Sequence, residues 1–471
     1  MMRGFLPASL KGEEVMKNLI YVFADQWRYH AYGFAGEDPV STPAMDDFAA
    51  ASLFCSQAVS TYPLCSPHRA ALMTGKHPLN TGFWTNCKIG LRDHIHIEDG
   101  ETLISDVLHE AGYYNGYIGK WHLDSSEMNY SDSPSSGAAC WDAYTPPGDR
   151  RHHFDYWYSY GAYDNHTAPH YWSSTDEMIT VNEWSPRHET DKAIGFLETR
   201  PSDRPFSLFI SWNPPHPPYD RVPEELLDLY PEEDIEFREN VPEKMRNSAQ
   251  YRLKLREYKA AVTGLDREFS RLVSYLKNSG LWDDTVLVLS ADHGDCMGSH
   301  GLYGKNIYYE ESVRIPLVIH DPSLPCGRYD GMVASEDHMP TLLELMDIPG
   351  PPSVEGKSHA GAMKGSGEKV RSFTEHLMIP GMPELVNPYL ERGLDNRAFG
   401  WRAIRDEGHT YVVDNGTRPG EAQKRILFDN VNDPYQLNAE ELDENDERAV
   451  YYDALLKGEL EKSHDDFLLR R

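Results

Sequence analysis

The segment TVLVLSADHGD (285–295) decides the fold class of this 471-residue chain. Its first seven residues form an apolar run rich in β-branched side chains, which is typical of a strand buried on both faces. The polar pair Asp292-His293 follows directly. Near the N-terminus, the run LIYVFA (19–24) is followed in the same way by Asp25-Gln26. The chain is therefore predicted to contain buried strands that end in metal-binding or catalytic residue types.

Further apolar runs are predicted as strands: YYNGYIG (113–119), FSLFISW (206–212) and PLVIH (316–320). Helical spacing of apolar residues lies between them, in 101–111 and in 246–279, and Gly280 ends the second pattern. This alternation predicts an α/β fold with a large, mostly parallel sheet flanked by helices. Such sheets bind ligands beyond the carboxyl ends of their strands, so the polar residues that follow the runs are expected to meet there.

The chain divides into three predicted parts. Residues 1–16 form an N-terminal extension, 17–365 the main domain, and 366–471 a smaller C-terminal α+β domain. In the last part, WRAIRD (401–406) and TYVVD (410–414) are expected strands of a small antiparallel sheet, and residues 440–471 an acidic helix. Residues 125–185 are rich in aromatic residues, Pro and Gly, and are expected to form long structured loops over a site.

Charge and cysteine usage exclude several classes of protein. The chain carries 45 basic and 75 acidic residues, a net charge of −30, which argues against nucleic acid or an anionic membrane as a partner. The N-terminus lacks the pattern of a signal peptide, and no apolar run is long enough to span a bilayer. The six cysteines form no CxxC pair or zinc spacing. A cytoplasmic protein is therefore expected.

The segment CSPHRAALMTG (65–75) is predicted to be a short helix. Pro67 suits its first turn, and Gly75 suits the position just past its end. Cys65 would then lie at the helix N-terminus, where partial positive charge favours an anion or a thiolate. Arg69, four residues on, falls on the same helix face. A nucleophile and a fixed cation are thus expected side by side.

The pattern Cys-x-Pro-x-Arg (65–69), continued by Met-Thr-Gly (73–75), resembles the signature of the formylglycine-dependent, arylsulfatase-like sulfatases of the alkaline phosphatase superfamily. In that family a formylglycine-generating enzyme oxidises the signature cysteine. Four other segments are similar to the family's active-site segments: NLIYVFADQWR (18–28), GKWHL (119–123), NPPHPPY (213–219) and SADHGDCMGSHGLYGKN (290–306). The resemblance implies an alkaline-phosphatase-like core with a smaller C-terminal domain, and a metal-dependent sulfuric-ester hydrolase. His68, where the family often has Ser, lies outside the invariant positions.

The resemblance and the residue types together imply a site for a divalent cation. Asp25, the Gln26 carbonyl, Asp292 and the formylglycine oxygen at position 65 would supply oxygen ligands, and His293 a nitrogen. Calcium is the expected ion, with Mn²⁺ or Mg²⁺ as alternatives. Gln26 and His293 stand where the family often has Asp and Asn. This combination resembles the phosphonate monoester hydrolases of the same superfamily.

The resemblance also implies the residues that act on the substrate. The catalytic set is Cys65, Arg69, Lys120, His122, His216 and Lys305. Cations in this set would stabilise the charge that spreads over the sulfate and the leaving oxygen. Asn86, in FWTN, lies where phosphonate hydrolases and choline sulfatases carry an Asn that contacts the substrate. Asp295 and His300 are expected to be structural.

The implied mechanism starts from hydrated formylglycine at position 65. One of its two hydroxyls, deprotonated with help from the metal and Asp292, would attack sulfur. His216, together with Lys305, would protonate the departing alcohol. The second hydroxyl would lose its proton to His122, which expels sulfate and regenerates the aldehyde.

The expected substrate is a small-molecule or glycan sulfate ester. A sulfated sugar is favoured because the aromatic segment 153–172 could stack on sugar rings, while steroid or simple aryl sulfates stay open. The main alternative is a phosphonate monoester or phosphodiester hydrolase, which Gln26, His293 and Asn86 favour. A non-catalytic binding module is disfavoured by the complete set of site residues, and nothing in the sequence supports a structural protein.

Overall fold

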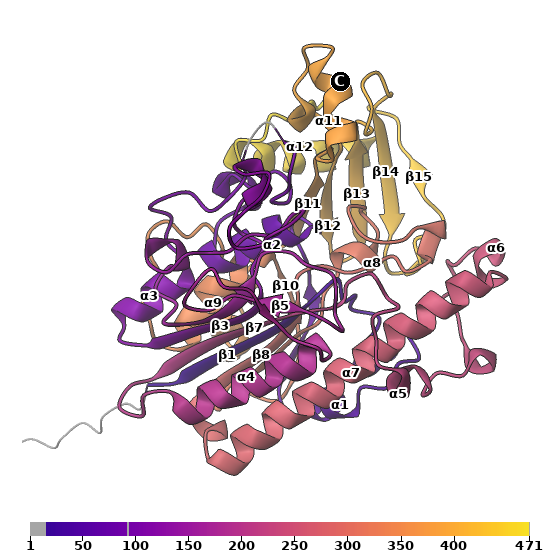
Figure 1. The fold of residues 1–471 in the computed structure, drawn as a ribbon. Helices are drawn as coiled ribbons and strands as arrows, with labels where there is room; N and C mark the ends of the chain where they lie inside the picture. Colours follow the sequence, from indigo (N-terminus) through magenta and orange to yellow (C-terminus); the bar gives the residue numbers. More distant parts are fainter. Residues whose placement is uncertain (1–15, 92–93, 471) are drawn as a thin grey trace, which may run out of the picture.

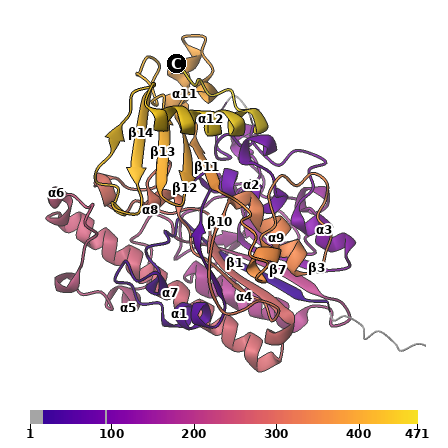
Figure 2. The same ribbon diagram turned by 180° about the vertical axis from the view of Figure 1, so that it is seen from behind.

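The computed structural model describes residues 16–91 and 94–470, so most of the expected extension, residues 1–15, lies outside the described part. The main layer is an eight-stranded sheet (Figures 1 and 2). Its strands in spatial order are β10 (Gly327–Val333), β2 (Leu53–Ala58), β9 (Leu317–His320), β8 (Thr285–Ala291), β1 (Asn18–Asp25), β7 (Phe206–Pro215), β3 (Tyr114–Lys120) and β4 (Tyr156–Tyr160). All run parallel except β9, which is antiparallel to both its neighbours. The predicted mostly parallel sheet is confirmed.

Helices cover both faces of this sheet, as Figures 1 and 2 show from opposite sides. One face carries α1 (Pro43–Ala50), α4 (Ser185–Thr199) and α7 (Ala249–Ser279), and the other carries α2 (Cys65–Thr74), α3 (Ile104–Glu110) and α9 (His338–Leu345). Shorter helices lie in the connections: α5 (Glu224–Leu227), α6 (Glu243–Arg246), α8 (Glu310–Val313) and α10 (Ala360–Met363). Because both faces are covered, the central strands are fully buried, which explains their nearly continuous apolar sequences.

A second, antiparallel sheet lies above the first (Figure 1, yellow). Its strands are β11 (Phe373–Met378), β12 (Trp401–Asp406), β13 (His409–Asp414), β14 (Lys424–Asp429) and β15 (Glu440–Glu441). Helix α11 (Pro383–Leu390) follows β11, and α12 (Glu447–Lys462) packs on the sheet around a small core of its own. The two predicted strands are confirmed, and the expected acidic helix occupies the middle of residues 440–471. The domain boundary at residue 365 stays a prediction.

Residues 125–185 are mostly irregular, as expected, and Trp141, Ala162 and Asp164 line the pocket, but the segment also contains three short strands. Strand β4 lies at one edge of the main sheet, and β5 (His170–Tyr171) pairs with β6 (Ile179–Thr180). Six aromatic side chains between residues 153 and 172 are buried: Phe154, Trp157, Tyr158, Tyr160, Tyr171 and Trp172. The expectation that residues 153–172 stack on sugar rings is wrong for these six, because their rings pack against one another and against the sheet. Strands β2 and β10 were also not expected.

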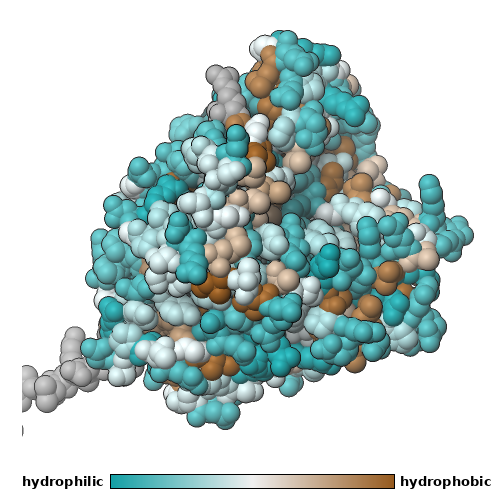
Figure 3. All heavy atoms as spheres, in the orientation of Figure 1, coloured by the Kyte–Doolittle hydropathy of each residue, from teal (hydrophilic) through white to brown (hydrophobic). Residues whose placement is uncertain are grey.

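The surface is mostly hydrophilic, as the face in Figure 3 shows. This agrees with the excess of acidic residues. Among the described residues, no helix combines the length and apolar character needed to cross a membrane.

Gly119 lies in β3 just before Lys120, where the backbone of β7 leaves no room for a side chain. Its φ is 93°, and a Cβ atom there would lie 2.1 Å from the carbonyl oxygen of Ser211 on β7. Gly280, at the end of α7, has a similar φ of 76° with open space around it. We expect Gly280→Ala to lower the free energy of unfolding by about 1–2 kcal/mol, from backbone strain alone. Gly119→Ala should lower it by roughly 3 kcal/mol or more, since overpacking adds to the same strain. Urea unfolding measures both, and equal losses would contradict this account.

Candidate active site

Residues from four adjacent central strands meet at the carboxyl edge of the main sheet. Asp25 is the last residue of β1, Asp292 follows β8, Lys120 ends β3, and His216 follows β7. These strands are neighbours in the order β8-β1-β7-β3. Parallel neighbours bring their carboxyl ends to one place, so the predicted convergence is confirmed.

Helix α2 brings Cys65 to this edge as the first helical residue. Leu64 before it is extended, and Gly75 after the helix has a left-handed φ of 65°, as the sequence predicted. The Cys65 side chain is 1% exposed. Its Sγ lies 3.0 Å from Lys305 Nζ and 3.7 Å from Asp25 Oδ1. This sulfur marks the place of the oxygen that formylglycine would carry.

Four of the predicted metal ligands form one buried group. The ligand atoms of Asp25, Cys65, Asp292 and His293 all lie within 4.8 Å of one another. Two carboxylates, an imidazole and the position of an aldehyde-hydrate oxygen form a donor set that suits a hard divalent cation. These residues therefore could hold a divalent cation, and calcium as that ion stays a prediction.

Gln26, the fifth predicted ligand, borders the same pocket. Its backbone N–H donates to Asp292 Oδ1 at 3.0 Å, and its side-chain amide donates to Asp295 Oδ2 at 2.6 Å. Asp295 also accepts the backbone N–H groups of Met297 and Gly304. Asp295 thus shapes the loop that leads to Lys305, in agreement with the expected structural role.

His300, the other residue expected to be structural, stacks on Tyr309 with ring centroids 3.6 Å apart. It does not line the pocket that holds Cys65.

Cations hold the buried carboxylates in place. Arg69 lies 3.0 Å from Asp25 and 3.1 Å from Asp292, and Lys120 Nζ lies 2.8 Å from Asp25 Oδ2. Burial alone would raise the pKa of Asp25, but Lys120 and Lys305 hold it well below its ordinary value. Burial and the nearby Asp25 instead raise the pKa of Asp292. The two carboxylates therefore differ in charge preference, and a bound cation would relieve their repulsion.

The position of Cys65 favours an anion. Burial and Asp25 would raise the pKa of its thiol, but Lys305 and Lys120 outweigh them and hold it well below the ordinary value. The first turn of α2 adds partial positive charge. A negatively charged nucleophile would thus be stabilised at this position.

Two histidines border the nucleophile position with opposite protonation preferences. Burial lowers the pKa of His122. Burial, Lys120 and Lys305 would also lower the pKa of His216, but Asp164 and Asp25 together raise it to about 9. At neutral pH the site therefore offers one neutral and one protonated imidazole.

A pocket of about 440 Å³ is lined by Cys65, Lys120, His122, His216 and Lys305, whereas Asp25, Arg69, Asp292 and His293 lie behind this lining. Asn86 also lines it, and its Oδ1 accepts the backbone N–H of Ser66 at 2.9 Å, which fixes the first turn of α2. Part of the opposite wall comes from the segment 378–382, which begins with the last residue of β11, and from Leu385 on α11. The second sheet therefore completes the pocket.

Several residues at the site were not predicted from the sequence. Asp164 pairs with His216 at 3.3 Å, and Asn213 Oδ1 accepts a hydrogen bond from Lys120 at 3.1 Å. Lys88 and Trp141 also line the pocket. The signals available were the position of Lys88 two residues after Asn86, and of Asp164 within the segment expected to lie over the site.

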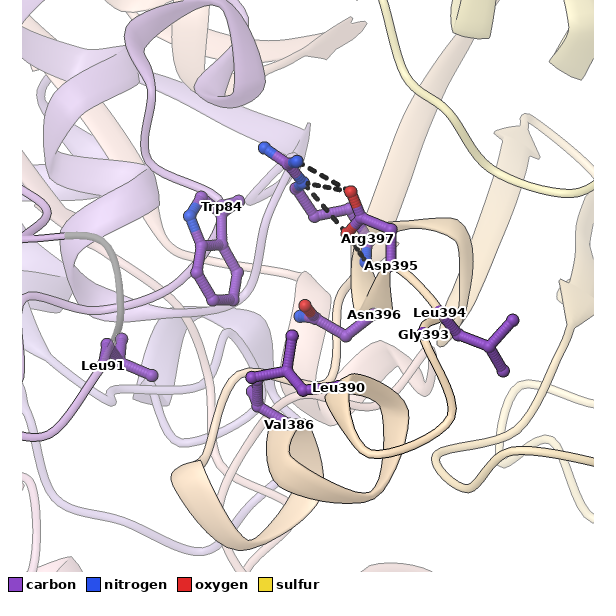
Figure 4. A pocket seen from close by; sticks show the side chains of 9 residues that line it. All are labelled: Trp84, Leu91, Val386, Leu390, Gly393, Leu394, Asp395, Asn396 and Arg397. Carbon is purple, nitrogen blue, oxygen red and sulfur yellow. Dashed lines mark hydrogen bonds and ion pairs between the residues drawn. The ribbon is translucent and has the colours of Figure 1, made fainter.

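A second hollow of about 510 Å³ lies next to the active pocket. It shares α11 and the segment around Trp84 with it, and Figure 4 shows Val386 and Leu390 of α11 on one side. Asp395 and Arg397 on its rim form an ion pair at 2.7 Å. No residue of the predicted site lines this hollow, so the chemistry belongs to the pocket that holds Cys65.

The amino-acid sequence of this chain is similar to those of known sulfatases. The model of the sulfatase family matches residues 17–348. An endo-4-O-sulfatase of Bacteroides thetaiotaomicron is 35% identical, over 91% of this chain and 89% of that protein. An ulvan-active sulfatase of Formosa agariphila is 31% identical, over 90% of this chain and 77% of that protein.

Solved structures of other proteins share the fold of this chain. One from a study of glycosaminoglycan metabolism by Bacteroides thetaiotaomicron has a TM-score of 0.85 at 32% identity, and covers 96% of this chain and 97% of that one. A phosphonate monoester hydrolase of Silicibacter pomeroyi has a TM-score of 0.72 at 19% identity, covers 95% of each chain, and shows likeness of fold alone. The sulfatase family uses a divalent metal and formylglycine, and this chain has a buried group that could hold the ion. It belongs to the sulfatase family of the alkaline phosphatase superfamily and is a sulfuric-ester hydrolase.

Proposed function

We propose that this protein removes sulfate from a sulfated glycan, with formylglycine at position 65 and a bound calcium ion. The observation that carries the proposal is the place of Cys65: buried at the start of α2, among Asp25, Asp292 and His293, and 3.0 Å from Lys305. A formylglycine-generating enzyme would mature this cysteine. A bound cation would act as a Lewis acid, and the hydrate of the formylglycine aldehyde would supply the oxygen nucleophile.

Arg69 and Lys120 position and balance the charged groups. Arg69 bridges the two carboxylates, and also donates to the Lys120 carbonyl and to Ser211 Oγ, both at 2.7 Å. It is therefore fixed at both ends of its guanidinium. Lys120 is held between Asp25 and Asn213, with its ammonium at the edge of the pocket. Fixed cations of this kind stabilise charge that develops on sulfate oxygens without needing to reorganise.

His216 is the proposed proton donor to the leaving alcohol. Its Nδ1 is engaged by the carbonyl of Pro217 at 2.7 Å and by Asp164 at 3.3 Å. This leaves Nε2 as the nitrogen that can reach a substrate. A pKa of about 9 keeps the ring protonated at neutral pH, as a general acid requires.

His122 is the proposed proton acceptor. Its Nε2 lies 3.0 Å from the Cys87 carbonyl, which only accepts hydrogen bonds, so this nitrogen carries the hydrogen. Nδ1 therefore holds the lone pair and is buried, and the ring interacts with the side chain at position 65. Burial keeps the imidazole neutral by lowering its pKa. A neutral acceptor next to the nucleophile can take the proton whose loss releases sulfate.

A glycan substrate is proposed from the relatives and the pocket size. The relatives named above are an endo-4-O-sulfatase and an ulvan-active sulfatase. A pocket of about 440 Å³ suits a sugar unit with its sulfate. Phosphonate or phosphodiester hydrolysis is the second candidate, since His293 Nε2 lies 3.5 Å from Cys65 Sγ and brings a nitrogen donor to the site. Comparing kcat/KM on a sulfated sugar, an aryl sulfate and phenyl phosphonate separates the two.

Replacing Cys65 tests the nucleophile. Cys65→Ala should lower kcat on p-nitrophenyl sulfate by about 10⁴-fold or more, because no oxygen nucleophile can form. Cys326→Ala, at an exposed cysteine just before the edge strand β10, is the matched control and should keep full activity. Peptide mass spectrometry across residue 65 of protein made with the maturing enzyme should show an aldehyde in place of the thiol. Full activity of Cys65→Ala would reject the proposal.

His216→Gln tests the proton donor through the leaving group. A sugar alcohol needs protonation as it leaves, and p-nitrophenolate does not. We therefore expect a loss of roughly 10²- to 10⁴-fold in kcat on a sugar sulfate, and a much smaller loss on p-nitrophenyl sulfate. Since the acid form exists below its pKa, wild-type turnover of the sugar sulfate should persist to about pH 9 and fall above it. Equal losses on both substrates would contradict the role.

Metal removal tests the cation site. Calcium at 1,000 times its dissociation constant should stabilise the chelated protein by about 4 kcal/mol, seen as a higher Tm, and should restore activity. Asp292→Asn should abolish this Tm shift, while Asp228→Asn, at an exposed aspartate, should keep it. A larger shift with manganese than with calcium would favour the alternative ion.

A further inference from the structure

Lys88 is a buried cation in the wall of the active pocket. It follows Asn86 by two residues, lines the pocket, and is only 4% exposed. Its backbone carbonyl accepts a hydrogen bond from the Asn129 side chain at 3.0 Å, so the segment is anchored. Neither the sequence motif nor the proposed mechanism uses this side chain.

The ammonium group of Lys88 lacks a strong partner. Its Nζ lies 3.2 Å from Met382 Sδ and 5.2 Å from the centre of the Trp141 ring. A thioether is a weak acceptor, and a ring face gives only a modest attraction. Both partners also line the pocket. Among the described residues, no carboxylate pairs with Lys88, so this cation is directed at the space where a substrate would bind.

A buried, unpaired ammonium is costly, and its pKa reflects this. Burial lowers the pKa of Lys88 to about 8, with partial compensation from the fields of Cys65 and Glu384. A lysine is almost never fully buried unless it is paired, and Lys88 lies in the wall of the pocket, where a ligand can supply the pair. The missing partner is therefore expected to be an anion of the ligand.

The other two lysines of the pocket are already engaged. Lys120 pairs with Asp25 at 2.8 Å, and Lys305 lies 3.0 Å from Cys65. Both belong to the group around Cys65 that would bind the sulfate that is cleaved, which carries a single negative charge. Lys88 lies apart from this group, next to Met382 and Trp141, and is available to bind a second negative charge.

We infer that Lys88 forms a subsite for a second anionic group on the substrate, a carboxylate or another sulfate, near the sulfate that is hydrolysed. Lys88 and Cys65 line one pocket of about 440 Å³, so the second anion lies on the same sugar unit or the next one. The inference rests on the proposed function and narrows its substrate to a glycan with more than one acidic group. A sulfated but otherwise neutral sugar would leave Lys88 unpaired.

Calorimetric binding to the Cys65→Ala protein, which cannot turn substrate over, tests the subsite. Three disaccharides share one sulfated hexosamine. The first has a neighbouring uronic acid, the second has that carboxyl reduced to an alcohol, and the third is the reduced form with a second sulfate. The measured quantity is the affinity of each acidic disaccharide divided by that of the neutral one. Adding Lys88→Met should lower this ratio roughly 10- to 100-fold, as expected for loss of a hydrogen bond between charged groups.

Matched variants separate charge from folding. Lys259 on α7 is also 4% exposed and also has a pKa lowered to about 8 by burial, but it lies outside the pocket. Lys259→Met should leave the ratio at its original value, and Lys88→Arg should retain most of it. Thermal unfolding of each variant reports folding directly.

The effect of Lys88→Met on the affinity ratio shows whether the subsite exists and which anion it binds. A fall in the ratio only for the uronic acid form identifies a carboxylate subsite, and a fall only for the disulfated form identifies a sulfate subsite. An unchanged ratio in a folded Lys88→Met protein, or no preference for either acidic form before the change, overturns the inference. Turnover is measured separately with matured wild-type protein. Failure of hydrolysis with a ratio that depends on Lys88 would reject the proposed function alone.

Discussion

The structure of the active site depends on the pairing of two buried carboxylates with two buried cations. Asp25 and Asp292 are fully buried at the ends of adjacent strands, and Arg69 and Lys120 bind them from α2 and β3. Removing a charge from water costs several kcal/mol even after relaxation, so any one of these groups would be unstable without the others. The ends of β1, β3 and β8 and the start of α2 must therefore assemble together. The same requirement leaves the site ready for a cation, because Asp292 keeps a raised pKa next to Asp25.

This local balance explains how a strongly acidic chain can bind an anion. The net charge of −30 is spread over the chain, and the surface seen in Figure 3 is mostly hydrophilic. The pocket instead gathers Lys88, Lys120, Lys305 and His216. Charges beyond about a Debye length of 8–10 Å are largely screened, whereas buried groups are screened much less. An anionic substrate therefore experiences the pocket more strongly than the acidic exterior.

The residues around Cys65 could be predicted from the sequence better than the residues that line the rest of the pocket. Asp25, Asp292 and Lys120 could be placed because each ends or follows a strand, and parallel strands deliver their ends to one edge. Cys65 could be placed because Pro67 and Gly75 mark the helix that carries it. Lys88 and Asp164 come from irregular segments, whose positions depend on tertiary packing that no local period records. Strand β4 was missed because its sequence, YWYSY, is as aromatic as the loops around it, and β10 was missed because much of it is exposed.

This difference between the residues around Cys65 and the facing wall of the pocket follows from the elements that carry them. The groups around Cys65 are attached to central strands and to a helix packed on them, and there a small displacement would expose or unpair a buried charge. The facing wall comes from the segment 378–382 at the end of β11, held to the main layer by Leu377 N–H donating to Thr61 O and by Tyr62. Such connecting segments can change in sequence with little effect on the buried charges. A chain of this architecture can thus keep its buried charge network while the facing wall of the pocket changes.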